Sequence, residues 1–382
     1  MTKTAYDGPR SMFPEEYDEL MDLKEIAYGE TRQRFLNYFP HTSRRENFIF
    51  DNHFIIKQNG RMLSHVGLIP MDAYAVGSKV KVGGIGGVAT HPDARGKGLM
   101  GKLLDYSAKR MKEKEIPLSI LWGDTQRYRH FGWETAGRQM VFHLSRRSTR
   151  GINVDREFTL RGYRGGEDLD RIAKIHDREP LRCVRILRDY EQMLKRTQIE
   201  VWLGNEGNSW AYAVFSGNEV IEFGGEPSTV AKLFTFMLYH YPLQIIKVHA
   251  PYRESLMLHT LYEISFLWEV VPLGMIKVVN LEKLLRCFQK QLQKKTELFK
   301  IERGMAITLR TEQSQQQATL TMGDRLKVTT EASDEMVFLS DIELARLLFG
   351  PSAENFGENI VQKRLLNCLF PLDFYVWGLD VV

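Results

Sequence analysis

Apolar residues follow two periods along the first third of the chain, and these periods predict its elements. A spacing of three and four residues indicates helices, and short runs of apolar and β-branched residues indicate strands. A turn with Asn59-Gly60 at its centre predicts a hairpin. The predicted elements, in chain order, are helices Pro14–Ala27 and Thr31–Tyr38, strands Phe48–Lys57, Met62–Tyr74 and Val82–Thr90, a helix that begins at Leu99, strand Pro117–Trp122, loop Gly123–His130 and a strand pair that runs from Phe131 through Phe142.

A similar order of elements returns over residues 156–290, and it predicts a second, degenerate copy of the first unit. Its predicted elements are strand Phe158–Tyr163, helices Asp168–Asp177 and Cys183–Thr197, strands Ile199–Leu203, Ser209–Phe215 and Val220–Phe223, helix Pro227–Tyr241 and strand Leu243–Ala250. Glu222 and Glu226 flank the turn before that last helix, and no arginine stands there. Because two acids would repel a diphosphate, we expect this copy to be structural or substrate-shaping.

The remaining residues predict a third part and a buried end. Its predicted elements are strand Leu273–Asn280, helix Leu281–Leu292, strands Met305–Arg310, Gln317–Met322 and Asp324–Thr329, and helices Asp341–Leu348 and Asn359–Leu369. The final segment, Phe370–Val382, is aromatic and apolar, whereas a free tail would be polar. We therefore expect the end of the chain to dock into the protein.

The turn between Thr90 and Leu99 carries the clearest chemical signal. His91-Pro92-Asp93-Ala94 ends the strand, and Arg95-Gly96-Lys97-Gly98 leads into the helix. A glycine-rich turn before a helix leaves backbone N–H groups unpaired at its positive end, where Arg95 and Lys97 add charge. This arrangement predicts an anion site, most simply for a diphosphate.

Two other phosphate motifs fit this turn poorly, and a plain structural turn remains the alternative. A P-loop would require Ser or Thr after Lys97 or Lys102, and neither follows. Gly96, Gly98 and Gly101 spell the dinucleotide fingerprint, but the preceding segments look like an antiparallel meander instead of a βαβ unit. What remains is the pattern Arg-x-x-Gly-x-Gly/Ala, matched except at Met100.

Composition narrows the class of protein. A length of 382 residues predicts two or three domains, and a net charge of +4 argues against a dedicated nucleic-acid binder. The three cysteines, Cys183, Cys287 and Cys368, lack metal-ligand spacing, so we expect no metal site and a reducing compartment. No signal peptide is recognisable, and no apolar run reaches the roughly 18 residues of a membrane span. We expect a cytoplasmic protein.

The pattern at Arg95–Met100 resembles the coenzyme A loop of the GNAT superfamily of N-acetyltransferases. Together with Tyr128-Arg129-His130-Phe131-Gly132-Trp133, it resembles the enhanced-intracellular-survival (Eis-type) branch, which tolerates a residue such as Met100. The resemblance implies a mixed α+β chain of tandem GNAT-like domains, 1–150 and a degenerate 151–292, followed by a sterol-carrier-like α+β domain at 293–382. It also implies a homo-oligomer, for instance a hexamer.

The expected coenzyme contacts follow the strand and the turn. The pantetheine arm would pair with the backbone of Val88, Ala89 and Thr90, and Arg95 would assist the diphosphate. The N–H groups expected to hold the diphosphate belong to Gly96, Lys97, Gly98, Leu99, Met100 and Gly101. The resemblance also places Gly123 and Asp124 near the coenzyme arm.

Acetyl transfer to an amine requires a base and an acid. An alkyl amine with a pKa of about 10.4 is mostly protonated at neutral pH, and the leaving thiol has a pKa of about 8.5. The resemblance implies Tyr128 as general acid and the C-terminal carboxylate, here that of Val382, as base; the alternative for Tyr128 is a structural role. His65 and His130 are the competing bases, and we rank both below Val382.

Three functions follow as hypotheses. The first is an acetyl-CoA-dependent N-acetyltransferase acting on a primary amine of a small polycation, with aminoglycosides as the class implied by the resemblance. The second is a binding protein for coenzyme A or an apolar ligand that lacks catalysis. The third is a peptide or protein N-acetyltransferase. A deep acidic pocket would favour the polycation, and a shallow open groove would favour a peptide.

Overall fold

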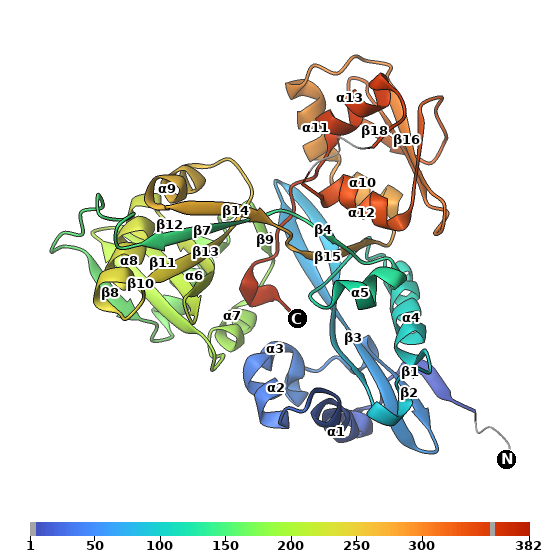
Figure 1. Ribbon diagram of the computed structural model, residues 1–382, viewed down its shortest axis with the longest axis horizontal. Helices are drawn as coiled ribbons and strands as arrows, with labels where there is room; N and C mark the ends of the chain where they lie inside the picture. Colours follow the sequence, from blue (N-terminus) through green and yellow to red (C-terminus); the bar gives the residue numbers. More distant parts are fainter. Residues whose placement is uncertain (1–4, 352–355) are drawn as a thin grey trace.

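Three β-sheets with their helices make up the described part of the chain, residues 5–351 and 356–382 of a computed structural model (Figure 1). The first and second sheets lie side by side, and the third lies above the first in this view. None of the described helices has both the length and the apolarity that crossing a membrane requires. The mixed α and β composition expected from the sequence is confirmed.

The first sheet has the strand order β1-β2-β3-β4-β5-β15-β6, and β9 pairs with β3. Its strands are β1 (Asp7–Ser11), β2 (His53–Gln58), β3 (Arg61–Ala75), β4 (Ser78–Thr90), β5 (Leu118–Leu121), β6 (Glu134–Ala136), β9 (Leu181–Cys183) and β15 (Gly274–Val278). Its helices are α1 (Tyr17–Tyr28), α2 (Arg32–Tyr38), α3 (Pro40–Ser43), α4 (Leu99–Glu113) and α5 (Thr125–Tyr128). Asn59 and Gly60 both have positive φ, as the predicted hairpin requires.

The second sheet has the order β14-β7-β13-β12-β11-β10-β8. Its strands are β7 (Gln139–Ser145), β8 (Thr159–Gly162), β10 (Glu200–Glu206), β11 (Ser209–Ser216), β12 (Glu219–Gly225), β13 (Ile245–Pro251) and β14 (Leu267–Val271). Its helices are α6 (Glu167–His176), α7 (Leu187–Met193), α8 (Pro227–His240) and α9 (Leu256–Ile264). The parallel pair β12–β13 repeats the parallel pair β4–β5 of the first sheet, and each pair is joined by a helix. The second unit is therefore a structural counterpart of the first.

The two sheets exchange strands, and this corrects one sequence-based prediction. Residues 131–142 were expected to form one strand pair, but β6 lies in the first sheet and β7 in the second. Gly137, with a φ of +82°, lies in the short connection between them. In return, β15 pairs with β5 and β6 in the first sheet. The predicted domain boundaries at residues 150 and 292 stay predictions, and strands from each side of residue 150 cross over.

Three other element predictions differ from the structure. Cys183 is not helical: β9 adds to the far end of β3, opposite Ala73 to Ala75, and the helix begins later, at Leu187. The strand expected from Phe48 begins at His53, after a 3-10 turn. The loop expected at Gly123–His130 contains α5. In the first case a tertiary strand pairing, which no local pattern reveals, decides the conformation.

The third sheet, of order β18-β17-β16-β19, belongs to the C-terminal part. Its elements are β16 (Ala306–Thr311), β17 (Gln317–Thr321), β18 (Lys327–Thr329), β19 (Met336–Leu339), α10 (Leu281–Cys287), α11 (Gln289–Leu298), α12 (Asp341–Phe349) and α13 (Ile360–Leu369). The helix expected over Leu281–Leu292 is thus divided near Phe288. The sterol-carrier-like character of this part stays a prediction.

After α13 the chain runs as an extended tail between the first and second units (Figure 1). Phe374, Tyr375, Val376, Trp377 and Leu379 are all buried, so the expected docking of the chain end is confirmed. These residues pack with the apolar core that the units share.

An ionic cluster with no contact to solvent holds the end of the tail. The Arg185 guanidinium donates to both carboxylate oxygens of Asp380 at 2.7 Å, and to both oxygens of Glu222 at 2.9 and 2.6 Å. The side chains of Arg185, Glu222 and Asp380 are at most 3% exposed. Arg196 donates to the carbonyl of Leu379 at 2.6 Å. Arg185 therefore ties the tail to strand β12 of the second sheet.

We expect Arg185→Met to lower the free energy of unfolding by about 3–5 kcal/mol, because it leaves two buried carboxylates without their cation. Urea denaturation followed by circular dichroism measures the change. Lys195→Met, which removes an exposed pair with Glu191 on the same unit, is the matched control and should change stability little. Equal effects of the two substitutions would contradict the assigned role of Arg185.

Candidate functional site

The site lies where strands β4 and β5 separate. They pair in parallel over Val82–Gly84 and Leu118–Ile120, and beyond these positions the ladder ends. A bulge in β4 accompanies the separation: the pairing with β3 shifts register near Gly87, whose φ is +59°. The backbone of β4 after the bulge therefore borders open space on the side of β5. Two cavities occupy this space.

The larger cavity, here called the turn cavity, has a volume of about 640 Å³. Its lining residues are Ala27, Tyr28, Val88, Ala89, Thr90, Ala94, Arg95, Gly96, Gly98, Leu99, Met100, Gly101, Arg127 and Phe131. Gly98 precedes α4 with a φ of +72° and no side-chain cap, so the first N–H groups of the helix lack intrahelical partners. A Cβ on Gly96 or Gly98 would meet nothing within 4 Å, which leaves their surroundings open.

Helix α4 is held in place by its apolar face. Leu99, Leu103, Leu104 and Met111 are buried at helical spacing, in the core beneath β2, β3 and β4. The helix therefore presents its positive N-terminal end to the turn cavity, where Arg95 and Arg127 add two full positive charges. The lining contains no aspartate or glutamate among the described residues, so the cavity suits an anion.

Nine of the twelve residues predicted to bind coenzyme line the turn cavity, and three do not. Lys97 is exposed at the outer side of the turn. Asp124 caps α5 by accepting from the Gln126 N–H at 2.9 Å. A Cβ on Gly123 would lie 2.6 Å from the Tyr128 ring, so Gly123 makes room for that ring. Direct coenzyme contact by these three is not favoured by the geometry, and the binding roles of the nine stay predictions.

Five lining residues were not predicted from the sequence, and besides the small residues Ala27 and Ala94 they are Tyr28, Arg127 and Phe131. Tyr28 reaches the cavity from α1, where its hydroxyl donates to the carbonyl of Val88 at 2.8 Å. Arg127 comes from α5, and Phe131 packs against the helix at Gly101. Arg127 precedes Tyr128 in the segment that the sequence predicts to be a loop. An arginine in a predicted loop does not by itself indicate a binding site.

The smaller cavity, here called the inner cavity, has a volume of about 190 Å³. Its lining residues are Lys24, Tyr28, Phe35, Phe39, Thr42, Ser43, His53, Ile69, Ile85, Gly86, Gly87, Val88, Leu121, Trp122, Tyr128 and Val382. It adjoins the turn cavity, since Tyr28 and Val88 line both. Tyr128 and the chain terminus, the two residues predicted to do the chemistry, therefore meet in one cavity.

The terminal residue touches the bulged strand directly. A Cβ on Gly86 would lie 3.0 Å from the carbonyl carbon of Val382, so only a glycine allows the terminus to approach so closely. Tyr128 is 8% exposed, and burial raises the pKa of its phenol. A phenol with a raised pKa stays protonated at neutral pH and can act as a proton donor.

The two competing histidines differ in their surroundings. His65 is buried; its Nδ1–H donates to the Gly87 carbonyl at 2.7 Å, and its Nε2 lies 3.0 Å from His53 Nδ1. Because a carbonyl can only accept, neutral His65 carries its proton on Nδ1, and His53 donates to Nε2. His65 thus supports the bulge. His130 is exposed and does not line the inner cavity among the described residues.

The second unit contacts the segment of the first unit that contains α3 and the turn after it, next to the inner cavity. The Asn47 amide lies 2.6 Å from the Gln192 carbonyl oxygen, and Arg188 donates to Asn47 at 2.7 Å. Arg196, which holds the tail, also contacts the ring of His41 in α3 at 3.2 Å. The cavity is therefore lined by the first unit and the tail, and the second unit contacts the helices of the first unit from the other side.

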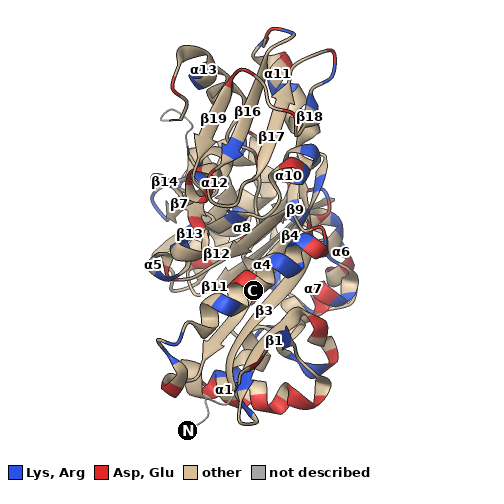
Figure 2. Cartoon of the chain, turned by 90° about the vertical axis from the view of Figure 1, so that its right-hand side faces the viewer, with Lys and Arg blue, Asp and Glu red and all other residues tan. Residues whose placement is uncertain are grey.

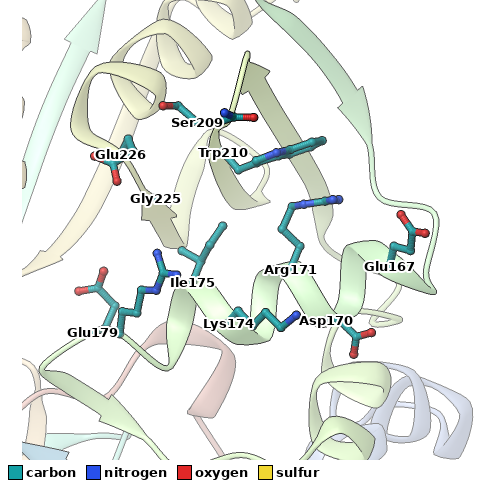
Figure 3. A pocket seen from close by; sticks show the side chains of 12 residues that line it. Glu167, Asp170, Arg171, Lys174, Ile175, Glu179, Ser209, Trp210, Gly225 and Glu226 are labelled. Atoms are coloured by element: carbon teal, nitrogen blue, oxygen red, sulfur yellow. The ribbon is translucent and has the colours of Figure 1, made fainter.

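A separate cavity of about 530 Å³ lies on the second unit, where α6 faces the start of β11 (Figure 3). Arg171 of α6 lies flat against the Trp210 ring, 3.8 Å from its centroid. Glu226 lines this cavity, but Glu222 does not: it is buried against Arg185, contrary to the expected pair of flanking acids. Pro227 begins α8 and supplies no N–H there. The absence of coenzyme binding here stays a prediction.

Charge is distributed over the whole molecule. Figure 2 shows acidic and basic residues on all three parts of the chain. Among the described residues, no three histidine, cysteine or acidic side chains lie close enough to hold a metal ion.

Comparison with known proteins agrees with this geometry. Residues 9–136 match the family model of the acetyltransferase (GNAT) domain. The search of curated proteins finds no match.

Several solved structures share the fold over the full length. A probable N-acyltransferase of Enterococcus faecalis V583 has a TM-score of 0.76 at 16% identity, covering 99% of this chain and 100% of its own. A GCN5-related N-acetyltransferase of Anabaena variabilis has a TM-score of 0.74 at 14% identity, covering 100% of both chains. Eis1 of Mycobacterium abscessus has a TM-score of 0.70 at 12% identity, covering 99% and 100%. The predicted fold is confirmed, and residues 9–136 match the GNAT family that the sequence predicted.

The His65 arrangement predicts a pH dependence of stability. Burial lowers the pKa of His65 to about 3, below its unfolded value of about 6.5. The contribution of His65 to the free energy of unfolding is therefore fully present above about pH 6.5. It falls as the pH drops towards 3, because the unfolded chain binds the extra proton. We expect His65→Gln to reduce this slope by up to about 1.4 kcal/mol per pH unit.

Denaturant unfolding at several pH values between 7 and 4 measures the slope. His259→Gln, at an exposed histidine of α9, is the control and should leave the slope as in the wild type. A slope unchanged by His65→Gln would show that this ring is protonated in the native state, against the assigned hydrogen bonds.

Proposed function

We propose that this chain, whose residues 9–136 form a GNAT acetyltransferase domain, is an acetyl-CoA-dependent N-acetyltransferase that acts on a primary amine by direct attack in a ternary complex. The observation that carries the proposal is the meeting of the turn cavity and the inner cavity at the point where β4 and β5 separate. The turn cavity suits the coenzyme. The inner cavity adjoins the turn cavity and is lined by Tyr128 and Val382.

The turn cavity offers each part of the coenzyme a partner. The unpaired N–H groups at the start of α4, with Arg95 and Arg127 beside them, suit the diphosphate. The pantetheine arm would lie along Val88–Thr90, whose backbone borders the gap between the strands. This direction leads the thioester towards the inner cavity and Tyr128.

The residues of the inner cavity supply the two proton transfers. The ammonium form of the amine first releases a proton to solvent, and the neutral amine then attacks the thioester carbonyl carbon while the Val382 carboxylate takes the second proton from the nitrogen, which leaves a tetrahedral intermediate. The C–S bond then breaks, and Tyr128 protonates the departing thiolate. The protonated phenol and the close approach of Val382 to Gly86 support these roles.

The acceptor expected from the resemblance is a small polycation such as an aminoglycoside. The described residues that line the inner cavity include no aspartate or glutamate, so this expectation lacks the acidic pocket it would require. A peptide acceptor would require an open groove, and α2, α3 and the tail enclose the cavity instead. A small amine is therefore the acceptor that the geometry favours.

A cytoplasmic homo-oligomer, such as a hexamer, belongs to this proposal as an expectation from the sequence. The edge strand β14 of the second sheet supports it, because Leu267 and Trp268 are each 51% exposed there. Exposed apolar residues on a sheet edge suit contact with another chain.

Release of free coenzyme A from acetyl-CoA over a panel of amines tests the function. We expect turnover with at least one primary amine, and Tyr128→Phe should lower kcat by about 10²-fold or more, because the acid is lost. The affinity for acetyl-CoA, measured by calorimetry, should be unchanged. Tyr239→Phe, at an exposed tyrosine of α8, is the control and should keep full activity.

The outcomes separate the candidate functions. A protein that binds acetyl-CoA but turns over no amine would be a non-catalytic coenzyme-binding protein. A protein that neither binds acetyl-CoA nor turns over any amine would refute the proposal, and full activity of Tyr128→Phe would remove the acid role alone.

The position of the terminal carboxylate gives a second test. A chain that ends at Val381 moves the carboxylate by one residue, and we expect kcat to fall by about 10²-fold or more while the affinity for acetyl-CoA is kept. Val382→Ala retains the carboxylate in place and should keep most of the activity. If both changes lower kcat by the same factor, the side chain of Val382 is required for turnover and the position of its carboxylate is not.

A further inference from the structure

Lys24 is a buried cation at the wall of the inner cavity. It lies on α1, is 5% exposed and lines the cavity. A Cβ on Gly87 would lie 3.1 Å from its Nζ, and the Phe35 ring centroid lies 5.9 Å from the same atom. Among the described residues, Lys24 has no ion pair and no hydrogen-bond partner. Its ammonium group therefore faces the cavity without a counter-charge.

Such an arrangement is costly unless a ligand completes it. A buried ammonium loses its hydration and normally requires a carboxylate or several acceptors. Burial, with no carboxylate to oppose it, lowers the pKa of Lys24 to about 8. His65 cannot serve as an acceptor, because it uses both ring nitrogens, on Gly87 and His53, and no hydrogen bond joins Lys24 to His53 among the described residues. An anionic group of a bound ligand would supply the partner that Lys24 lacks in the described structure.

The opposite charge stands one residue away on the same bulge. The Val382 carboxylate approaches Gly86, while the Lys24 ammonium approaches Gly87. Between and around these groups the lining is apolar and aromatic, with Phe35, Phe39 and Trp122 among its members. The cavity thus presents one negative group, one positive group and an apolar wall.

We propose that the acceptor amine is a small zwitterion with an apolar body, of the kind represented by an apolar amino acid, and that its anionic group pairs with Lys24. The amine end would lie at the Val382 carboxylate and the thioester. This inference rests on the proposed acetyltransferase function and names its class of acceptor. A volume of about 190 Å³, below the roughly 300–1,000 Å³ of drug-sized sites, agrees with a small molecule.

The same charge acts against a polycation. Each further ammonium brought into the inner cavity would be repelled by Lys24 at short range, in a site where burial weakens screening. Specificity therefore arises both from the attraction of one anion and from the exclusion of additional cations.

The test compares matched acceptors that differ in one charge. Every assay contains acetyl-CoA as the acetyl donor. The acceptors are a panel of apolar α- and ω-amino acids, the corresponding amides and an aminoglycoside. For the wild type we expect at least one acid to exceed its amide in kcat/KM by about tenfold or more. Lys24→Met should remove this preference by lowering kcat/KM of the acid about tenfold or more relative to kcat/KM of the amide.

Two further measurements keep the result interpretable. Lys24→Arg retains the charge and should keep a preference for the acid, and Lys195→Met is the exposed control. Thermal unfolding of Lys24→Met should show a protein at least as stable as the wild type, because an unpaired buried charge is gone; a clear loss of stability would assign Lys24 to the fold instead.

The possible failures are distinct. If no amine is acetylated, the proposed function fails. If amines are acetylated but no acid exceeds its amide, or if Lys24→Met leaves the ratio unchanged, the function stands and the zwitterion proposal is overturned. Calorimetric binding of the same acids to the coenzyme A complex, with wild type and Lys24→Met, gives a readout that does not depend on turnover.

Discussion

The buried contact of Arg185 with Asp380 and Glu222 is the interaction on which the shape of the site depends. One guanidinium satisfies two carboxylates from segments nearly 160 residues apart in sequence, and it does so away from solvent. Each of these charged groups would be costly to bury without its partners. The tail therefore has to bring Asp380 to Arg185 when it docks. Val382 follows Asp380 by two residues and lies against Gly86. The position of Val382 therefore follows from the contact of Asp380 with Arg185.

The separation of β4 and β5 creates the space that the tail enters. The bulge at Gly87 turns the strand away from its neighbour, and the pair of His53 and His65 holds the bulge open with neutral rings. On one side of the gap lies a helix end that attracts anions; on the other lies a small cavity with Lys24, Tyr128 and the terminus. The chemistry therefore depends on backbone geometry as much as on side chains.

The second unit has a structural role in the site of the first unit. Its helix α8 begins with a proline after an acid, which removes the features that suit a phosphate. Strand β12 carries Glu222, which pairs with Arg185. Arg196, after α7, contacts both the tail at Leu379 and helix α3 at His41. The exchange of β7 and β15 between the sheets binds the two units together. The second unit anchors the tail and contacts the helices that border the first unit's site.

Local features of the sequence were sufficient for much of this protein. Periodicity predicted most helices and strands, the Asn-Gly turn predicted the hairpin, and the Arg-Gly-Lys-Gly turn lies, as predicted, between strand β4 and the start of helix α4, because each depends on neighbouring residues. The apolar tail predicted its own burial. Tertiary structure alone decided the strand exchange, the pairing of β9 with β3, the Arg185 cluster and the isolation of Lys24. These depend on residues distant in sequence that meet after folding, and a lysine within an amphipathic helix gives no sign that it will be buried without a partner.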